Sequence, residues 1–378
     1  QLRESVNSRI GGYVLSGDIQ AELKVFDRHT RQELIFGEVS GTVRRLSTIR
    51  DGYGNTISFF YQQDHLTHVR HSDGYELTLS SLNGRVTAID LHSQGKIQRL
   101  VTCQYDDRGM LAECDTFQFS HKGYTWSPEN RMLHWWDADG TQVDLFYDEQ
   151  GRVTETRTPE GYFNDHFTYD DTERRNTYHD AEGGQTTYWY NDDGLVVREA
   201  DPLGRETLTE WAHSKRQSQT DALGRTSTWQ YNLYGDITRL SLPGGIMLHY
   251  EYDARGNLTR FQGAGNKIWQ FTYDEHGGLR EMTDPQGRQR HWHYGDHGEV
   301  LRQVLPDGET WHYGYDPLHR LNCIEDPAQG EIRIEQDILG RLLTVSDPLQ
   351  QKTTYRHSTR HASLSGSVTH LTLSLIHI

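Results

Sequence analysis

The sequence predicts an all-β protein in which short antiparallel hairpins stack side by side into one spiralling sheet. Three observations predict this fold. Tyr, Trp and Gly are frequent (21, 9 and 36 residues), although hydrophobic residues reach only 34%. An aromatic residue recurs about every 21 residues, and turn-forming residues recur in phase with it. The composition is typical of many short strands joined by turns, and the constant period indicates stacked structural repeats.

The repeat is anchored by one aromatic position that is filled in eleven consecutive units, after which Gln336 occupies the same position. A second large residue often lies two positions earlier, as Phe271 does before Tyr273. A spacing of two places both side chains on one face of an extended strand. The aromatic positions are Tyr105, Trp126, Tyr147, Tyr169, Tyr190, Trp211, Tyr231, Tyr252, Tyr273, Tyr294 and Tyr315.

A turn follows each aromatic position. Asp comes one residue after the aromatic, Gly four residues after it and an aliphatic residue six after it, as in Tyr252-Asp253-Ala254-Arg255-Gly256-Asn257-Leu258. An Asp side chain can accept hydrogen bonds from the backbone of its own turn, and Gly adopts a positive φ without a Cβ clash. The pattern therefore predicts a hairpin whose second strand opens at the aliphatic residue.

A second turn lies half a repeat away, with Asp201-Pro202-Leu203-Gly204-Arg205 as its clearest copy. Pro presets φ at the start of such a turn and Gly ends it. Each unit is therefore strand, turn, strand, turn. A β-propeller is the competing architecture, because two units would make one four-stranded blade. The close likeness of successive units favours an open spiral. Further copies of this turn are Asp221–Arg225, Asp284–Arg288, Asp326–Gly330 and Asp347–Gln350.

Three segments are predicted along the chain. Residues 1–50 form the end of a preceding β-rich segment, residues 51–357 form the repeat array, and residues 358–378 form a truncated tail. The chain begins at Gln1 without an initiator Met, so we expect a cut N-terminus. The last six residues, 373–378, resemble the in-frame translation of a sequencing-adapter end, and we expect that they do not belong to the natural protein.

Charge and composition exclude several classes of function. The formal net charge of -16 argues against a sequence-independent nucleic-acid partner, which needs a cationic face. No stretch reaches the apolar length of a membrane span. Cys103, Cys114 and Cys323 contain no CxxC pair, so the sequence predicts reduced, partly buried thiols in place of a disulfide framework or a thiolate zinc site.

Candidate sites for ligand chemistry are few. His291 and His293 share one strand face at a spacing that a metal could use, but the sequence shows no third ligand, and surface or wall-lining histidine is favoured. The acidic turns 137–140 and 191–194 faintly resemble calcium loops but lack the later bidentate Glu. The repeated aromatics could stack on carbohydrate, although their strict phase favours packing.

Catalytic motifs are missing from the sequence. No GxSxG elbow, HExxH helix, P-loop or dinucleotide fingerprint occurs. Carboxylates are so numerous that pairs can be found at will, which gives a glycosidase no specific support. We therefore expect no catalytic residue, no cofactor and no metal site, and we predict that the chain is not an enzyme.

The two turn motifs together resemble the YD repeat of the Rhs proteins, tripartite-toxin components and teneurins, over about residues 51–357. The resemblance rests most clearly on residues 252–258 and 201–205. It implies a β-sheet that spirals into a hollow shell. The segments between the repeat copies are rich in histidine and tryptophan, and in this they are most similar to enterobacterial Rhs proteins. Nothing in the sequence resembles the closing segment with an aspartyl self-cleavage site that the family places after its repeats.

By this resemblance the chain is a non-catalytic shell segment that encloses a C-terminal toxin, which we expect to be missing from the sequence. The implied partners are that toxin, a type VI spike protein and an adaptor chaperone. The implied location is the bacterial cytoplasm before export, followed by secretion through a type VI system. The alternative is an extracellular adhesion or carbohydrate-binding wall protein at the cell surface, built from the same repeats.

Overall fold

The computed structural model describes residues 2–6, 12–18, 21–40, 42–117 and 121–357. Within these ranges the chain forms 34 β-strands and two 3-10 turns of three residues each, and it forms no α-helix. Each strand pairs antiparallel with the next, as β13 with β14 and β14 with β15. One open, meandering sheet results. The predicted all-β fold is confirmed, and separate propeller blades are excluded. The expected tail, 358–378, lies outside the described residues.

The strands are short. The first ten are β1 (Leu2–Val6), β2 (Tyr13–Gly17), β3 (Leu23–Asp27), β4 (Gln32–Ser40), β5 (Val43–Arg50), β6 (Thr56–Gln62), β7 (His65–His71), β8 (Glu76–Leu82), β9 (Arg85–Ser93) and β10 (Lys96–Tyr105). The next eleven are β11 (Leu111–Thr116), β12 (His121–Trp126), β13 (Met132–Asp137), β14 (Gln142–Tyr147), β15 (Val153–Arg157), β16 (His166–Asp170), β17 (Arg175–His179), β18 (Gln185–Tyr190), β19 (Val196–Ala200), β20 (Glu206–Ala212) and β21 (Lys215–Thr220).

The remaining strands carry the clearest copies of the repeat. They are β22 (Thr226–Tyr231), β23 (Ile237–Leu242), β24 (Ile246–Tyr252), β25 (Leu258–Gln262), β26 (Ile268–Tyr273), β27 (Leu279–Thr283), β28 (Gln289–Tyr294), β29 (Val300–Val304), β30 (Thr310–Tyr315), β31 (Leu321–Glu325), β32 (Glu331–Gln336), β33 (Leu342–Ser346) and β34 (Lys352–Thr354). The 3-10 turns η1 (Pro243–Gly245) and η2 (Ala264–Asn266) replace two loops between strands.

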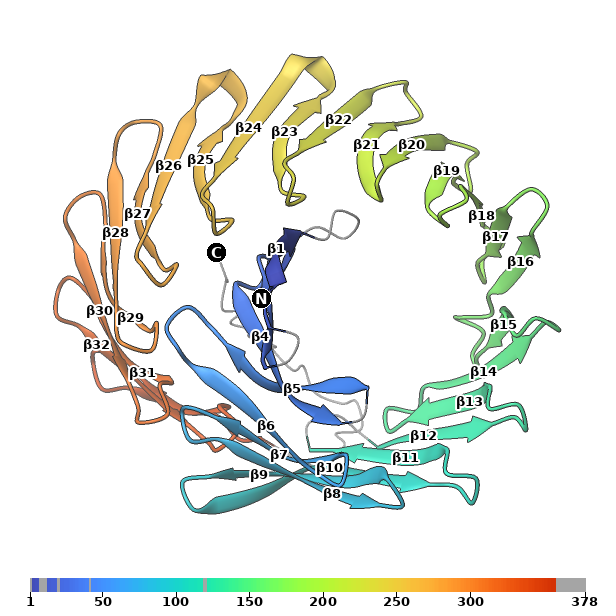
Figure 1. The fold of residues 1–378 in the computed structure, drawn as a ribbon, viewed down its shortest axis with the longest axis horizontal. Helices are drawn as coiled ribbons and strands as arrows, with labels where there is room; N and C mark the ends of the chain where they lie inside the picture. Colours follow the sequence, from blue (N-terminus) through green and yellow to red (C-terminus); the bar gives the residue numbers. More distant parts are fainter. Residues whose placement is uncertain (1, 7–11, 19–20, 41, 118–120, 358–378) are drawn as a thin grey trace.

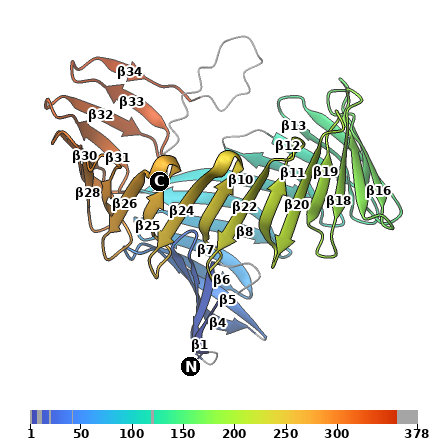
Figure 2. The same cartoon turned by 90° about the horizontal axis from the view of Figure 1, so that it is seen from above.

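The sheet curls into an open ring. Figure 1 shows the strands passing round it from β6 to β32, with β1, β4 and β5 within its outline. From above, the first strands lie at one end of the ring axis and β33 and β34 at the other (Figure 2). The sheet therefore rises as it turns, and its end passes its beginning without closing into a barrel.

The two predicted turns prove to be one type of loop. In the loop after Tyr252, the Asp253 amide donates to the Asn257 carbonyl at 2.9 Å. The Asp253 carboxylate accepts from the Arg255 and Asn257 amides at 2.9 and 2.8 Å. The corresponding carboxylate of Asp201 accepts from the amides two and four residues later, both at 2.9 Å. We call the loops after the repeated aromatic the YD loops, and those half a repeat away the DP loops.

The two kinds of hairpin differ in register. In β14–β15, Phe146 faces Glu155 but Tyr147 faces Val153, so Thr154 is an extra residue in a β-bulge. The same shift occurs at the repeated aromatic of β24–β25 and β28–β29. The DP hairpins β13–β14 and β27–β28 have an unshifted register. A bulge bends its strand and increases the local twist. Most YD hairpins carry such a bulge, whereas few of the other hairpins do, β9–β10 being one. The bulges therefore contribute to the curl of the wall.

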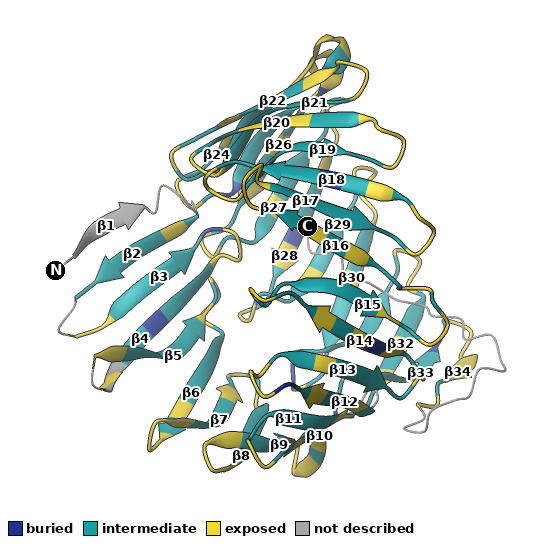
Figure 3. Ribbon diagram, turned by 90° about the vertical axis from the view of Figure 1, so that its right-hand side faces the viewer, coloured by how far each residue is buried: buried dark blue, intermediate teal, exposed yellow. Residues whose placement is uncertain are grey.

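The wall is one layer thick, and few side chains are deeply buried. Figure 3 shows mostly intermediate exposure along the strands. A single sheet has no second layer to cover either face, so stability comes mainly from contacts between neighbouring hairpins. The buried hydrophobic residues among those described are Ile35, Ala88, Leu91, Val143, Trp292 and Leu318.

Candidate functional site: the aromatic ladder and the seam of the wall

The repeated aromatic side chain ties each hairpin to the one before it. The Tyr252 hydroxyl donates to the Ile237 carbonyl at 2.9 Å, and the Trp211 indole donates to the Val196 carbonyl at 2.8 Å. Gln336 lacks a ring, yet its amide donates at 2.8 Å to the equivalent carbonyl of Leu321. The common property of this position is therefore a hydrogen-bond donor, which two aromatic residue types and one amide supply.

The β-bulge explains why a carbonyl is available to this donor. In most YD hairpins the accepting residue is the first of its strand and lies at the register shift, as Ile237 does in β22–β23. The hairpin β16–β17 has no shift in its register. The aromatic of the following unit, Tyr190, does not follow the pattern: its hydroxyl accepts from the Asn176 amide at 3.3 Å. The bulge of one YD hairpin and the side-chain donor of the following unit therefore occur together.

A second set of contacts joins parts of the wall that are far apart in the sequence. The Arg28 guanidinium lies in the loop between β3 and β4, and its side chain is 3% exposed. It donates to the Ala254 carbonyl at 2.7 Å and to the Asp236 carboxylate at 2.9 Å. Its carbon lies 3.9 Å from the centre of the Tyr234 ring. One buried cation thus connects two YD loops of the later strands.

Tyr53 makes the next contact along this line. It lies in the loop between β5 and β6, and its hydroxyl donates to the Asp274 carboxylate at 2.8 Å. Its ring stacks on His276 with 4.9 Å between centroids. The His276 ring in turn is 2.9 Å from the Gly52 carbonyl. A Cβ on Gly52 would lie 1.9 Å from the His276 carbonyl, so backbone approaches backbone here.

Three more contacts continue the line. The Asn55 amide donates to the His297 carbonyl at 2.8 Å. Gly74 lies against the Leu318 side chain, and the Arg341 guanidinium lies 4.7 Å from the centre of the Phe117 ring. Loops that lie mostly on the DP side of the early strands therefore meet YD loops of β22–β33. We call this line of contacts the seam, and it holds one turn of the spiral against the next.

Burial at the seam shows in the acid–base properties of its tyrosines. Burial, followed by the hydrogen bond to Asp274, raises the pKa of Tyr53 well above its usual range. Burial also raises the pKa of Tyr252, Tyr294 and Tyr315 to about 12. All four side chains are therefore neutral hydrogen-bond donors at physiological pH.

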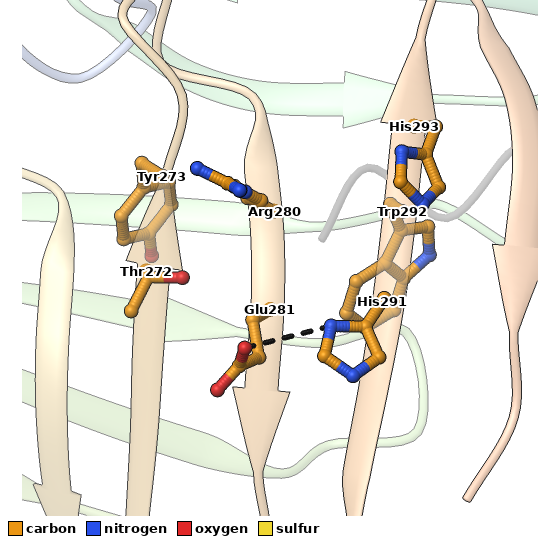
Figure 4. Close-up of a pocket in the computed structure, with 7 residues that line it drawn as sticks. All are labelled: Thr272, Tyr273, Arg280, Glu281, His291, Trp292 and His293. Carbon is orange, nitrogen blue, oxygen red and sulfur yellow. Dashed lines mark ion pairs between the residues drawn. The ribbon is translucent and has the colours of Figure 1, made fainter.

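The histidine pair predicted as a possible metal site lies in a pocket of about 400 Å³ (Figure 4). His291 lies 3.5 Å from the Glu281 carboxylate. The ring nitrogen Nε2 of His293 lies 2.6 Å from a guanidinium nitrogen of Arg302. Burial, and then this nearby cation, lower the pKa of His293. The two histidines of β28 therefore contact different strands: His291 pairs with Glu281 of β27, and His293 contacts Arg302 of β29.

The acidic turns and the cysteines have ordinary structural partners. The Asp137 carboxylate accepts from the Asp139 and Thr141 amides at 3.1 Å, and the Asn191 side chain has the same role in its loop. All three cysteines are free thiols. Cys103 of β10 lies opposite Cys114 of the adjacent strand β11, with 3.7 Å between the sulfurs. Burial raises the pKa of Cys103 to about 11.

The residues of the seam do not follow from the repeat pattern. Arg28, Tyr53 and Asn55 precede the clear copies of the repeat, and their partners lie between 208 and 242 residues later. Tyr53 is a large aromatic at the third position of the loop Asp51–Asn55, but Tyr234 and Leu318 hold the same position in later loops, so it does not stand out in the sequence.

Comparison with known proteins agrees with this architecture. A single-layer sheet of bulged hairpins whose successive turns meet at a seam defines a repeat protein that forms a shell wall. The family model Teneurin YD-shell matches residues 160–369, and the model RHS Repeat matches residues 126–162. The chain belongs to the YD-shell family of Rhs/YD-repeat proteins.

Two curated relatives from Dickeya dadantii (strain 3937) match 135 residues, or 35% of this chain. They are named Probable deoxyribonuclease RhsA (32% identical) and Probable deoxyribonuclease RhsB (30% identical). The matched segment spans 9% of either relative.

Solved structures of toxin complexes share the fold. A crystal structure of TcdB2-TccC3-TEV has a TM-score of 0.60 at 14% identity, and the match covers 92% of this chain and 24% of that one. The Tc holotoxin pore of Photorhabdus luminescens has a TM-score of 0.54 at 14% identity, over 88% and 24% of the two chains. The chain thus has the fold of shells found in toxin complexes.

The chain carries no candidate membrane-spanning helix in its described residues.

Proposed function

We propose that this chain is a non-catalytic wall segment of an Rhs shell, which encloses a toxin domain that follows the repeats in the full-length protein. The seam is the observation that carries this proposal. A curled sheet becomes a container only if successive turns are held together, and residues such as the buried Arg28 and the half-buried Tyr53 supply that contact. The relatives named as probable deoxyribonucleases suggest a nuclease as the enclosed toxin.

We further propose that the shell is made in the bacterial cytoplasm and exported by a type VI secretion system, with a spike protein and an adaptor chaperone as partners. The family resemblance supports this route. The single-layer wall fits the role of a vessel, because such a wall encloses space with few residues. In this proposal the wall takes no part in the chemistry of the toxin.

The test is electron microscopy of the full-length protein, together with limited proteolysis. We expect hollow density bounded by the sheet, and a C-terminal domain that resists protease until the wall is opened. The variant Gly52→Ala, designed to open the seam, should make that domain cleavable, whereas Gly54→Ala in the same loop should not. Solid density, or a C-terminal domain cleaved equally in all three proteins, would contradict enclosure. Glycan binding by the purified array would favour the surface-adhesion alternative.

A further inference from the structure

Three loops that are distant in the sequence bring a metal-binding set of side chains together at the seam. Asp73 lies between β7 and β8, His297 between β28 and β29, and His319 between β30 and β31. One ligand atom from each residue lies within 4.8 Å of the other two. The two imidazole rings are 3.8 Å apart between centroids. The cluster therefore links one turn of the spiral to two hairpins of the next.

Each of the three loops departs from the repeat at this point. His71 occupies the position of the loop Asp in the β7–β8 loop, and its ring accepts the Asp73 amide at 3.1 Å. Gly295 takes that position in the β28–β29 loop, where Glu299 instead accepts the His297 amide at 2.9 Å. His319 has a φ of 57° at a position that most loops give to Gly. Gln329 and Gln350 occupy the same position with φ of 65° and 64°, so the wall accepts a larger residue there, and His is among the residue types that adopt this conformation most readily.

Asp73 contributes a second, independent observation. Its Oδ1 atom is buried and has no hydrogen-bond partner, and the side chain is 16% exposed. The basic atom recorded nearest to Oδ1 is His297 Nδ1, at 3.8 Å, while His71 Nδ1 lies 3.5 Å from the other carboxylate oxygen, Oδ2. A buried carboxylate oxygen without a partner is costly, and a cation would satisfy it.

We propose that Asp73, His297 and His319 bind a divalent transition metal ion, with zinc as the best match, and that this ion staples the seam. Two imidazoles and one carboxylate form a common protein donor set for zinc, and imidazole disfavours magnesium and calcium. Ligand atoms around a tetrahedral zinc lie about 3.3 Å apart. Small side-chain rotations would bring the present atoms to that spacing.

Neighbouring groups suit this role. Glu299 lies 3.4 Å from Nδ1 of His319, and Asn55 Oδ1 lies 3.0 Å from Nδ1 of His297. Partners of this kind orient histidine ligands, and a carboxylate so close to the ion can also complete its coordination. His297 is exposed and His319 is half-buried, so an ion can reach the site from solvent. The inference concerns the wall alone and is independent of what the shell encloses.

The experiment is zinc titration of the chelator-treated chain against a chromophoric zinc indicator. Cobalt absorption then reports the coordination geometry. We expect one tight site per chain, with a tetrahedral cobalt spectrum and a rise in Tm on metal addition. His319→Gly restores the residue that most other loops carry, so the fold should persist while the affinity falls by at least about 10–100-fold, the loss typical even for outer-shell partners. Asp73→Asn, which preserves shape, should act similarly.

His291→Ala and His134→Ala are matched controls, because each removes a carboxylate-paired histidine outside the cluster. Both should retain the tight site. Equal zinc affinity in His319→Gly and the unmodified chain would overturn the proposal, as would the lack of any tight site. Loss of the site in the His291→Ala control would do the same, because it would place the metal in the pocket of Figure 4.

Discussion

The YD loops fall into two groups that share a motif and differ in surroundings. In Asp148–Arg152 the charges pair locally: Arg152 donates to Asp148 at 2.8 Å and to Asp171 of the next loop at 2.7 Å, and its side chain is 31% exposed. The later loop Asp253–Asn257 accepts Arg28 from another turn of the spiral, and Asn257 is 2% exposed. The motif therefore forms the same hairpin with or without a neighbouring turn. The seam forms where residues of the early loops, such as Arg28 and Tyr53, reach residues of these later YD loops, such as Asp274.

The largest effect should come from the buried cation. Arg28→Ala leaves Asp236 with its hydrogen bond from Asn232 but without its cation, and breaking a buried ion pair from one side costs about 3–5 kcal/mol. Arg152→Ala, its counterpart in the locally paired group, removes a solvent-screened surface pair and should change the free energy of unfolding far less. Hydrogen exchange should show loss of protection around residues 232–257 in Arg28→Ala alone. Equal losses in the two variants would remove the distinction between the groups.

The close approach of Gly52 offers a steric test of the seam. In Gly52→Ala the new Cβ overlaps the His276 carbonyl, and we expect a loss of about 1–3 kcal/mol, as for overpacking. Gly54→Ala is the control, because it is strained at φ 89° but has open space around it. That substitution should destabilise its own loop and leave exchange at 274–278 unchanged. Increased exchange there in both variants would mean that loop strain, and not the seam, controls the contact.

The aromatic ladder should respond equally in both groups, because its hydrogen bonds lie within the wall. Tyr252→Phe and Tyr147→Phe each leave a carbonyl without its donor, of Ile237 and Met132 respectively, at a cost of about 1–3 kcal/mol. Tyr252→Gln tests whether an amide can replace the phenol, as Gln336 does naturally. Denaturant unfolding measures all three. A penalty at only one of the two tyrosines would show that the ladder depends on the seam.

The smallest effect on stability is expected from a change of pH. It acts through the side chains of Tyr294 and Tyr315, which precede YD loops at the seam. Their pKa values are raised in the folded wall, to about 12 for Tyr294 and Tyr315, so the unfolded chain releases these protons first. Stability should be unaffected below the ordinary tyrosine pKa, about 10, and should fall as pH rises through the folded values. Tyr294→Phe should reduce that slope. Denaturation at a series of alkaline pH values measures it, and rising stability above pH 10 would contradict the prediction.

Much of the wall could be predicted because its hairpins are locally encoded. Asp253 and Gly256 supply the acceptor and the positive φ that the loop needs, and nothing distant is required. The shared geometry of the two turns was also present in the sequence, since Asp and Gly are three residues apart in both. The donor at position 336 is harder to recognise, because Gln shares no ring with Tyr or Trp and only the hydrogen bond to Leu321 shows what they have in common.

The seam could not be predicted, because it depends on how far the sheet curls in one turn. That curvature sums small bends at many bulges, and one sequence does not give their size. The candidate metal site shares this difficulty, since Asp73 and His319 belong to different turns of the spiral. Two departures from the repeat were nevertheless visible, Gly295 at an Asp position and His319 at a Gly position, in consecutive units.

The separation of 208–242 residues between hydrogen-bonded seam partners also constrains how such walls can evolve. Deleting one hairpin unit between Tyr53 and Asp274 would leave every hairpin intact, yet it would slide all later loops one place past their partners. The number of hairpins between two seam partners must therefore be conserved for the seam to form. Units can be gained freely only beyond the last loop that has found a neighbour.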